Sequence, residues 1–317
     1  MQVMSEIPNL GDILIPTFFK NATEAPAKEI GNQLSDLISI IFTPLAKAKI
    51  RQQSKLKQYM IDIEEKANQI PESDICEPNL HIIGPALEAS KYYYEDKVLR
   101  EMFANIIVSA MDVKKQPISH PSFVEVLKQI SPLDAHIISL FRKKTTLHAP
   151  TFSVTVIKDG EPEPPHESQP PGEVIGYHYP ETIYPITDVY LMNEHQGTLV
   201  LPNYFIETDA ADAAVVSTSI TNLLRLGLIS IDENIRLDEK QYNKFLNHPY
   251  YLDIMESYIK KADNNKIGFG SIRDNTVLLN SYERLELKKK SVRLTQYGYD
   301  FTRVCVLEKE IEFYRNR

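Results

Sequence analysis

A proline-rich segment in the middle of the chain sets the strongest limit on how the chain can fold. Eight of the 20 prolines lie between residues 149 and 185. Proline has no backbone N–H and a fixed φ, so the stretch 158–167, which holds three of these prolines, can be neither a regular helix nor a central strand. We therefore expect an exposed loop or linker over 158–167, with short strands beside it, the clearest at 152–157. This segment separates two parts that have different sequence patterns.

Helical periodicity dominates the part before the proline-rich segment. Apolar residues recur every three to four positions from about residue 26 to residue 70, which predicts two helices. Pro44 is expected to kink or end the first of them. The same periodicity predicts two more helices over 78–110, with a kink or a restart at Gly84-Pro85.

Polar residues and a glycine mark further element ends. Ser131, followed by Pro132 and Asp134, predicts a helix start in which Ser131 is the N-cap and Asp134 reaches back as in a capping box. Gly227 follows a helical pattern over 213–226 and is expected in the left-handed conformation that closes a helix, with a strand after it.

The order of these patterns predicts a mainly α-helical chain that is α+β overall. We expect an N-terminal helical domain over 1–130 and an α+β domain over 131–317, with an insertion at about 149–200. In the second domain a helix is expected over 242–262, and a strand at 291–294 leads into a terminal helix. A length of 317 residues is consistent with two domains.

The net charge disfavours a protein whose whole surface holds nucleic acid. The chain has 35 basic and 43 acidic side chains, a net charge of −8, whereas binding to phosphates needs an excess of Lys and Arg. The acidity belongs to the first two-thirds, since residues 202–317 carry 17 basic and 17 acidic residues. Small basic patches can still exist on such a surface.

Two basic patches stand out in the sequence. The first follows the uncharged run 37–46, a pattern typical of an interfacial membrane anchor, although a core helix followed by a solvated helix explains it equally well; its residues are Lys47, Lys49, Arg51, Lys55 and Lys57. The second could contact phosphates and consists of Lys288, Lys289, Lys290 and Arg293. No apolar run reaches the ~20 residues that span a bilayer, so we expect a cytoplasmic protein that could be peripheral to the membrane.

Three sequence blocks, 84–88, 99–112 and 120–135, resemble the abortive-infection alpha family of bacterial proteins in their order and in their residue sequence. The resemblance covers roughly residues 25–310. It implies a role in phage defence and brings no catalytic residues with it. Within these blocks we single out six residues as part of the motif that carries the resemblance: Arg100, Glu101, Asn105, His120, Pro121 and Ser122.

A second resemblance concerns the C-terminal part, which is similar to a winged helix-turn-helix split by insertions. It rests on Leu226-Gly227-Leu228-Ile229 and on Leu294-Thr295, with Gly298 three residues later. Helix 132–144 would then be the first helix and helix 213–226 the recognition helix. Helix 213–226 contains one cation, Arg225, whereas base recognition needs several basic or amide side chains. We therefore predict a protein-binding or structural module, with a nucleic-acid-binding regulator as the alternative.

No catalytic signature is visible. Ser119, His120 and Ser122 precede or follow a proline at a helix start, where such side chains usually cap the helix. The eight histidines have no metal-binding spacing, and no phosphate-binding glycine motif occurs. We predict no catalytic, metal or cofactor residues, lean against an enzyme without excluding one, and expect a protein partner or self-association, with a membrane surface as a further candidate.

Overall fold

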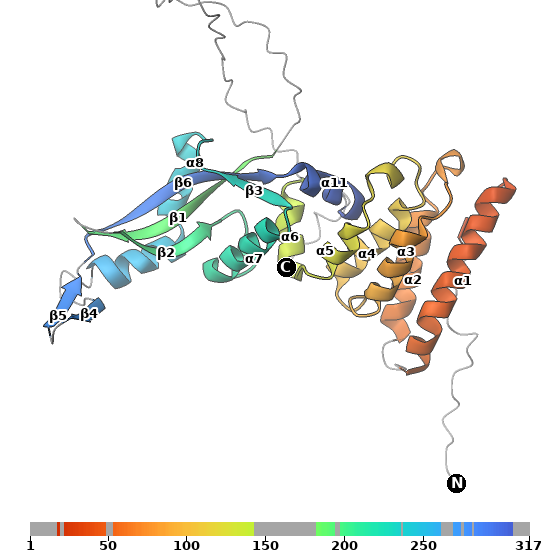
Figure 1. Cartoon of the computed structure of the whole chain (residues 1–317), viewed down its shortest axis with the longest axis horizontal. Coiled ribbons are helices and arrows are strands. Elements are labelled where there is room, and N and C mark those ends of the chain that lie inside the picture. Colours follow the sequence, from red (N-terminus) through yellow and green to blue (C-terminus); the bar gives the residue numbers. More distant parts are fainter. Residues whose placement is uncertain are drawn as a thin grey trace, which may run out of the picture.

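The computed structural model describes residues 18–19, 22–48, 53–142, 182–193, 197–235, 237–260, 269–273, 276–280 and 282–306. The expected strand at 152–157 and the expected loop at 158–167 lie outside these ranges. Within them, a helical part precedes a part that contains a sheet, which confirms the α+β class. The molecule is elongated, with helix α1 (Ala25–Ala48) at one end and the hairpin of β4 (Phe269–Arg273) and β5 (Thr276–Asn280) at the other (Figure 1).

The helical part consists of α1 and the elements that follow it along the chain. These are α2 (Gln53–Ala67), the 3-10 turn η3 (Glu72–Asp74), α3 (Leu80–Ser90), α4 (Lys97–Ser109), the 3-10 turn η4 (Gln116–Ile118), α5 (Ser122–Leu127) and α6 (Pro132–Leu140). The helices α2 and α3 pack against α4, which lies at the centre of this part.

Two prolines lie inside helices, and neither ends one. The helix α1 continues past Pro44 to Ala48, and α3 runs through Pro85 without the expected restart. A proline removes only one intrahelical hydrogen bond. Ile83 and Ala86 are fully buried on the two sides of this site, and their packing keeps α3 in one piece.

The capping box expected at Ser131 is present, and a second side-chain cap begins α4. Ser131 and Asp134 form the capping box of α6, because the Ser131 Oγ accepts a hydrogen bond from the Asp134 N–H at 3.1 Å and the Asp134 Oδ2 accepts one from the Ser131 N–H at 2.7 Å. Asp96 is the N-cap of α4 and accepts from the Leu99 N–H at 3.0 Å. Such local contacts fix where each helix begins.

The second part is built on a four-stranded antiparallel sheet in the order β2-β1-β6-β3. Its elements are β1 (Tyr184–Met192), β2 (Gly197–Tyr204), α7 (Ala213–Arg225), β3 (Ile229–Asp232), α8 (Glu239–Leu246), α9 (Pro249–Ile254), the π-helical turn η5 (Met255–Lys260), the β4–β5 hairpin, β6 (Arg284–Leu294) and α11 (Gln296–Cys305). The helix α7 lies between the sheet and the helical part (Figure 1).

Two expectations for the second part need correction. The strand expected at 291–294 is only the end of β6, an 11-residue strand of the sheet. Its lysines at 288–290 pair with β1, whereas β3 pairs only with residues 291–294. The helix expected at 242–262 is divided into α8, α9 and η5. It breaks because Pro249 begins α9, while the His248 side chain caps α9 by accepting from the Tyr250 N–H at 3.3 Å.

Gly227 and Gly298, the two glycines of the winged-helix-like motif, lie where the turn after α7 meets the turn before α11. Gly227 has φ 71° and closes α7 as expected. Across from it, the Thr295 Oγ1 donates to the Gly227 carbonyl at 2.5 Å and accepts from the Gly298 N–H at 2.9 Å, which caps α11. A Cβ on Gly298 would lie 1.8 Å from the Leu228 carbonyl oxygen. This close approach of two backbones explains the motif as a packing requirement.

One hydrophobic core continues across both parts. Its buried residues include Phe103 in α4, Ile220 in α7 and Phe301 in α11. A smaller second cluster, with Tyr204 and Phe245, lies towards the far end of the sheet. The domain boundary near residue 130 stays a prediction, as does the winged-helix comparison.

Candidate functional site

A groove beside α7 is the candidate functional site. It has a volume of about 890 Å³ and lies between the residues that link α5 to α6 and the side of α7 that faces away from the sheet. The α5–α6 link contributes Ile130, Pro132 and Leu133 to its lining, and the α7 side contributes Ala211, Val215 and Thr218. Both walls therefore expose mainly apolar side chains and hydroxyl groups.

Val215 is the most informative residue of the groove. It lies in α7 with half of its side chain exposed (50%), whereas its neighbour Val216 is buried in the core. The cation at the rim, Lys128, is paired with Glu125 at 2.8 Å. The groove therefore offers a nearly uncharged surface, which suits an apolar segment of a partner.

Hydrogen bonds fix the two walls of the groove relative to each other. The Asn222 Nδ2 of α7 donates to the Gln129 carbonyl at 3.1 Å and to the Asp134 Oδ2 at 3.0 Å. The Arg225 Nη1 donates to the Gln129 Oε1 at 3.1 Å. The Asp134 Oδ1 is buried and has no hydrogen-bond partner within the described part of the chain. The groove is thus preformed, with one buried acceptor in its wall.

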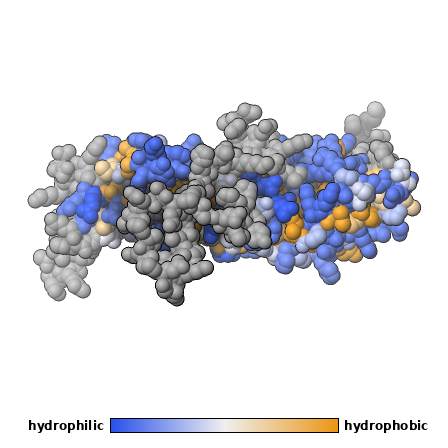
Figure 2. Space-filling model, turned by 90° about the horizontal axis from the view of Figure 1, so that it is seen from above, coloured by the Kyte–Doolittle hydropathy of each residue, from blue (hydrophilic) through white to orange (hydrophobic). Residues whose placement is uncertain are grey.

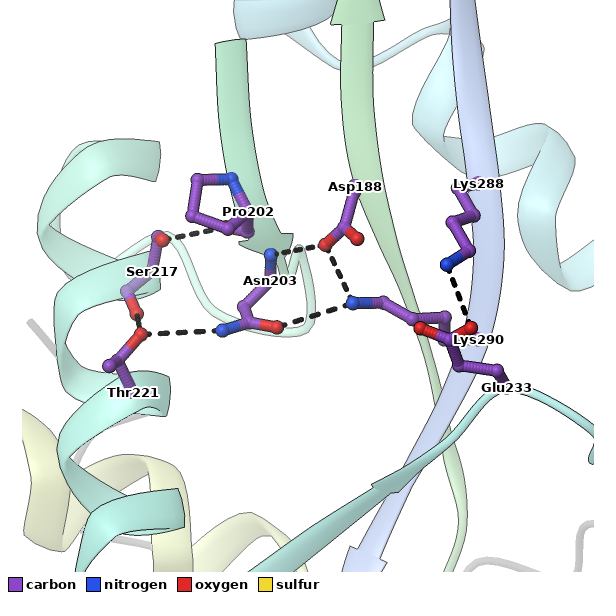
Figure 3. Close-up of polar contacts among 8 residues, drawn as sticks. All are labelled: Asp188, Pro202, Asn203, Ser217, Thr221, Glu233, Lys288 and Lys290. Atoms are coloured by element: carbon purple, nitrogen blue, oxygen red, sulfur yellow. Dashed lines mark hydrogen bonds and ion pairs between the residues drawn. The ribbon is translucent and has the colours of Figure 1, made fainter. Parts of the chain in front are cut away.

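The opposite side of α7 is attached to the sheet by a polar network (Figure 3). The Ser217 Oγ donates to the Pro202 carbonyl at 2.6 Å, and the Asn203 Nδ2 donates to the Thr221 Oγ1 at 3.3 Å. Asn203 has φ 50°, and its N–H donates to the Asp188 Oδ1 at 2.9 Å. These contacts hold α7 as a rigid wall, because they join β1, β2 and α7.

The three consecutive lysines predicted to contact phosphates are each paired with a carboxylate. Lys288 lies 2.7 Å from Glu233 and Lys289 lies 2.6 Å from Glu239. The Lys290 side chain is only 7% exposed and is paired with Asp188 at 2.7 Å (Figure 3). Arg293, the fourth member of this set, is half-buried on β6. The nucleic-acid alternative stays a prediction, but acidic residues neutralise the surface on which it depends.

The basic residues expected to meet a membrane or a partner lie away from the groove. Lys55 and Lys57 are exposed on α2, and Lys55 is 3.9 Å from Glu95. Lys47 is in the last turn of α1 with an undescribed side chain, and Lys49 and Arg51 lie outside the described residues.

The surface of the helical part also exposes apolar residues. Ile40 of α1 has 72% of its side chain exposed. Figure 2 shows hydrophobic residues at the surface of the helical part among hydrophilic ones. None of the helices that the structure describes has the length and hydrophobicity needed to cross a bilayer.

The polar residues of α4 serve packing. Arg100 donates from Nε to the Asp62 Oδ2 of α2 at 2.8 Å, whereas Asp96, one turn earlier on α4, is occupied as the N-cap. Glu101 lies 3.9 Å from Lys97. Asn105 is buried, and its Nδ2 donates to the Cys305 carbonyl of α11 at 2.8 Å.

His120 and Ser122 form a hydrogen-bonded start of α5. The His120 Nδ1 accepts from the Ser122 N–H at 3.2 Å and lies 2.6 Å from the Ser122 Oγ. The same Oγ is 2.6 Å from the Tyr297 hydroxyl of α11, and burial raises the pKa of Tyr297. Pro121 precedes the first residue of α5. These contacts satisfy the Ser122 N–H locally and add a link between the two parts. No group of His, Cys, Asp or Glu in the described ranges is arranged to hold a metal ion.

Sequence reasoning missed the groove itself. The capping box in its wall is readable from Ser131 and Asp134, and one more signal was available: Val215 and Val216 are adjacent, so one of them must lie off the core face of α7. Which surface the outward valine meets depends on the α5–α6 link, 80 residues earlier, and no periodicity reports that.

Comparison with known proteins gives one match. The family model of abortive infection alpha matches residues 51–305, which is most of the chain. No curated protein and no solved structure matches it.

Proposed function

The chain belongs to the abortive infection alpha family, and from this premise we propose that it acts in phage defence by binding a protein partner in the groove beside α7. The family supports the defence role. The partner and the binding mode are our own inference, as is a cytoplasmic location, and we propose no catalytic step.

The exposed position of Val215 carries this proposal. An apolar side chain half-exposed in a concave, mainly apolar groove loses contact with water when a partner covers it, which stabilises the complex by about 25 cal/mol per Å² of apolar surface. The walls are held by Asn222, Arg225 and the Asp134 capping box, so that little ordering is needed on binding. A partner segment with apolar side chains fits this chemistry best.

A phage-challenge assay tests the proposal. Bacteria that express the intact chain are compared with bacteria that express Val215→Asp, which places a charge in the groove. Leu252→Asp is the matched control, because Leu252 is 52% exposed on α9, away from the groove. Both variants are checked for unchanged thermal unfolding.

We expect the Val215→Asp variant to lose protection and the Leu252→Asp variant to keep it. Equal protection by both variants would exclude the groove as the binding site. No protection by the intact chain against a broad phage panel would contradict the defence role itself.

A membrane surface is the second candidate, and the exposed Ile40 favours it. This residue lies in the uncharged run 37–46, close in sequence to the five cations Lys47, Lys49, Arg51, Lys55 and Lys57. Flotation with anionic vesicles, compared with neutral vesicles, tests it with the intact chain and with the five cations replaced by Gln. Flotation lost in that variant supports this candidate, and no binding to anionic vesicles in any condition excludes it.

A further inference from the structure

The two ends of α7 place opposite charges at the two ends of the groove. Asp212, the N-cap residue of α7, is exposed and directly follows Ala211, which lines the groove. Arg225 is exposed in the last turn of α7 and donates hydrogen bonds to Asn222 and Gln129, which also line the groove. The apolar middle of the groove therefore lies between a negative end and a positive end.

Neither of these two charges is paired with an opposite charge. The Asp212 side chain accepts no hydrogen bond from the first turn of α7, and no described cation forms an ion pair with it. All the hydrogen bonds that Arg225 donates within the described ranges, at 2.8–3.2 Å, go to neutral amide oxygens. The helix dipole favours both signs, but it leaves each charge open to a counter-charge from a second molecule.

The exposed face of α7 is complementary to itself when a second α7 runs in the opposite direction. Asp212 and Arg225 are equally far along the chain from the midpoint between residues 218 and 219. The groove-lining residues Val215 and Asn222 share this midpoint. A two-fold axis there would bring Asp212 of each copy to the level of Arg225 of the other. The long arginine side chain can then reach the carboxylate across the helix pair.

We propose that the groove binds α7 of a second copy of this chain, antiparallel to the first and related to it by a two-fold axis. This inference rests on the proposed function, because it names the partner that the groove binds. The α7 helix of each copy covers Val215 of the other, which is 50% exposed in the single chain. It also packs against the apolar side chains of the α5–α6 link, among them Leu133. Because the axis repeats every contact, two Asp212–Arg225 pairs close the interface.

Sedimentation equilibrium of the intact chain tests the proposal. We expect a species of twice the mass of one chain at micromolar concentration. The Val215→Asp variant should sediment as a monomer, because the new charge has no partner in the apolar middle of the groove. Leu252→Asp, on α9, should remain a dimer. A monomeric intact chain, or a dimer that Val215→Asp leaves unchanged, would overturn the proposal.

Exchanging the two charges locates the interface. Asp212→Arg and Arg225→Asp each bring like charges together across the axis, so each variant alone should dimerise at least ~10-fold more weakly. Mixed in equal amounts, the two variants should form a heterodimer, because both opposite-charge pairs are restored. One chain that carries both substitutions should again form a homodimer. Thermal unfolding confirms that each variant is folded. Single variants that dimerise like the intact chain, or a mixture that stays monomeric, would contradict the two-fold arrangement.

Failure of the dimer and failure of the proposed function give different results. If the intact chain is a monomer and Val215→Asp still loses protection against phage, the groove binds another partner and only the dimer is wrong. If the charge variants control dimerisation and Val215→Asp keeps protection, the dimer stands and defence through the groove is wrong.

Discussion

Two sets of cations in this molecule, the consecutive lysines of β6 and the two separate residues Lys115 and Arg303, differ in whether a carboxylate pairs with them. In the sheet, Lys288, Lys289 and Lys290 follow one another in the sequence, yet each has its own carboxylate within 2.7 Å. At the junction with the helical part, Lys115 and Arg303 are 188 positions apart in the sequence, and no carboxylate pairs with either in the described structure. A run of cations in a sequence therefore does not show where positive charge remains uncompensated.

The largest expected effect concerns the buried ion pair of the sheet. Replacing Asp188→Asn leaves the Lys290 charge without its counter-charge at a site where that side chain is 7% exposed. We expect the free energy of unfolding to fall by about 3–5 kcal/mol, as in other broken buried pairs. Chemical denaturation measures this loss.

A double variant serves as the control for this pair. Asp188→Leu with Lys290→Met removes both charges and should recover most of the lost stability, because apolar residues of similar volume can replace a buried pair. A loss below about 1 kcal/mol for Asp188→Asn would show that the sheet does not depend on pairing, and the contrast with the junction would disappear.

The next effect compares one glycine from each part. Gly298→Ala should lower the free energy of unfolding by about 1–3 kcal/mol, because the added Cβ would overlap the Leu228 carbonyl. Gly84→Ala in α3 should raise it by up to ~1 kcal/mol, since nothing lies within 4 Å of that Cβ and alanine favours helix. Thermal unfolding of both variants should therefore show shifts of opposite sign. Shifts of the same sign would contradict the packing argument at Gly298.

A smaller effect concerns Lys115. Burial lowers the pKa of the Lys115 ammonium group in the folded state. The unfolded chain therefore binds this proton more tightly than the folded chain does. As a result, the free energy of unfolding rises with pH between the folded pKa and the ordinary value of 10.5. Without added anions, Lys115→Met should thus raise the Tm slightly at pH 7, and the advantage should shrink towards pH 10. The Tm difference measured from pH 7 to pH 10 checks this. An advantage that grows with pH would contradict the sign.

The smallest effect is expected for the outer sheet lysines. The side chains of Lys288 and Glu233 are 48% and 55% exposed, and pairs exposed to that degree contribute little to stability. Lys288→Gln and Lys289→Gln should each leave the free energy of unfolding almost unchanged. Denaturation in low and high salt measures the change. A loss of stability as large as that of Asp188→Asn would show that these exposed ion pairs contribute as much as the buried pair of Asp188 and Lys290.

Features set by neighbours in the sequence could be predicted. The capping box at Ser131 and Asp134, the left-handed Gly227 and the start of α4 at Asp96 all depend on contacts within a few residues. The order of helical part and sheet part could be read in the same way, because periodicity is local.

Features set by distant contacts could not be predicted. Arg100 pairs with Asp62 rather than with Asp96 because α2 lies against α4. Lys290 is buried because its side chain lies against Asp188 of β1 and Asn203 of β2, which no run of lysines indicates. The groove needs α7 beside the α5–α6 link, a contact between positions about 90 residues apart. Sequence patterns report which side of an element is apolar, but not which element covers it.

The contact between α4 and α11 has a consequence for the synthesis of the chain. The buried side chains of Asn105 and Ser109 find their acceptors on the carbonyls of Cys305 and Val304, about 200 residues later. While the ribosome is still making the sheet part, these two acceptors are absent and α11 does not yet cover the apolar face of α4. The helical part can complete its core only when α11 has left the exit tunnel. A chain released before residue 305 therefore lacks more than its last helix, because its first half is also unfinished.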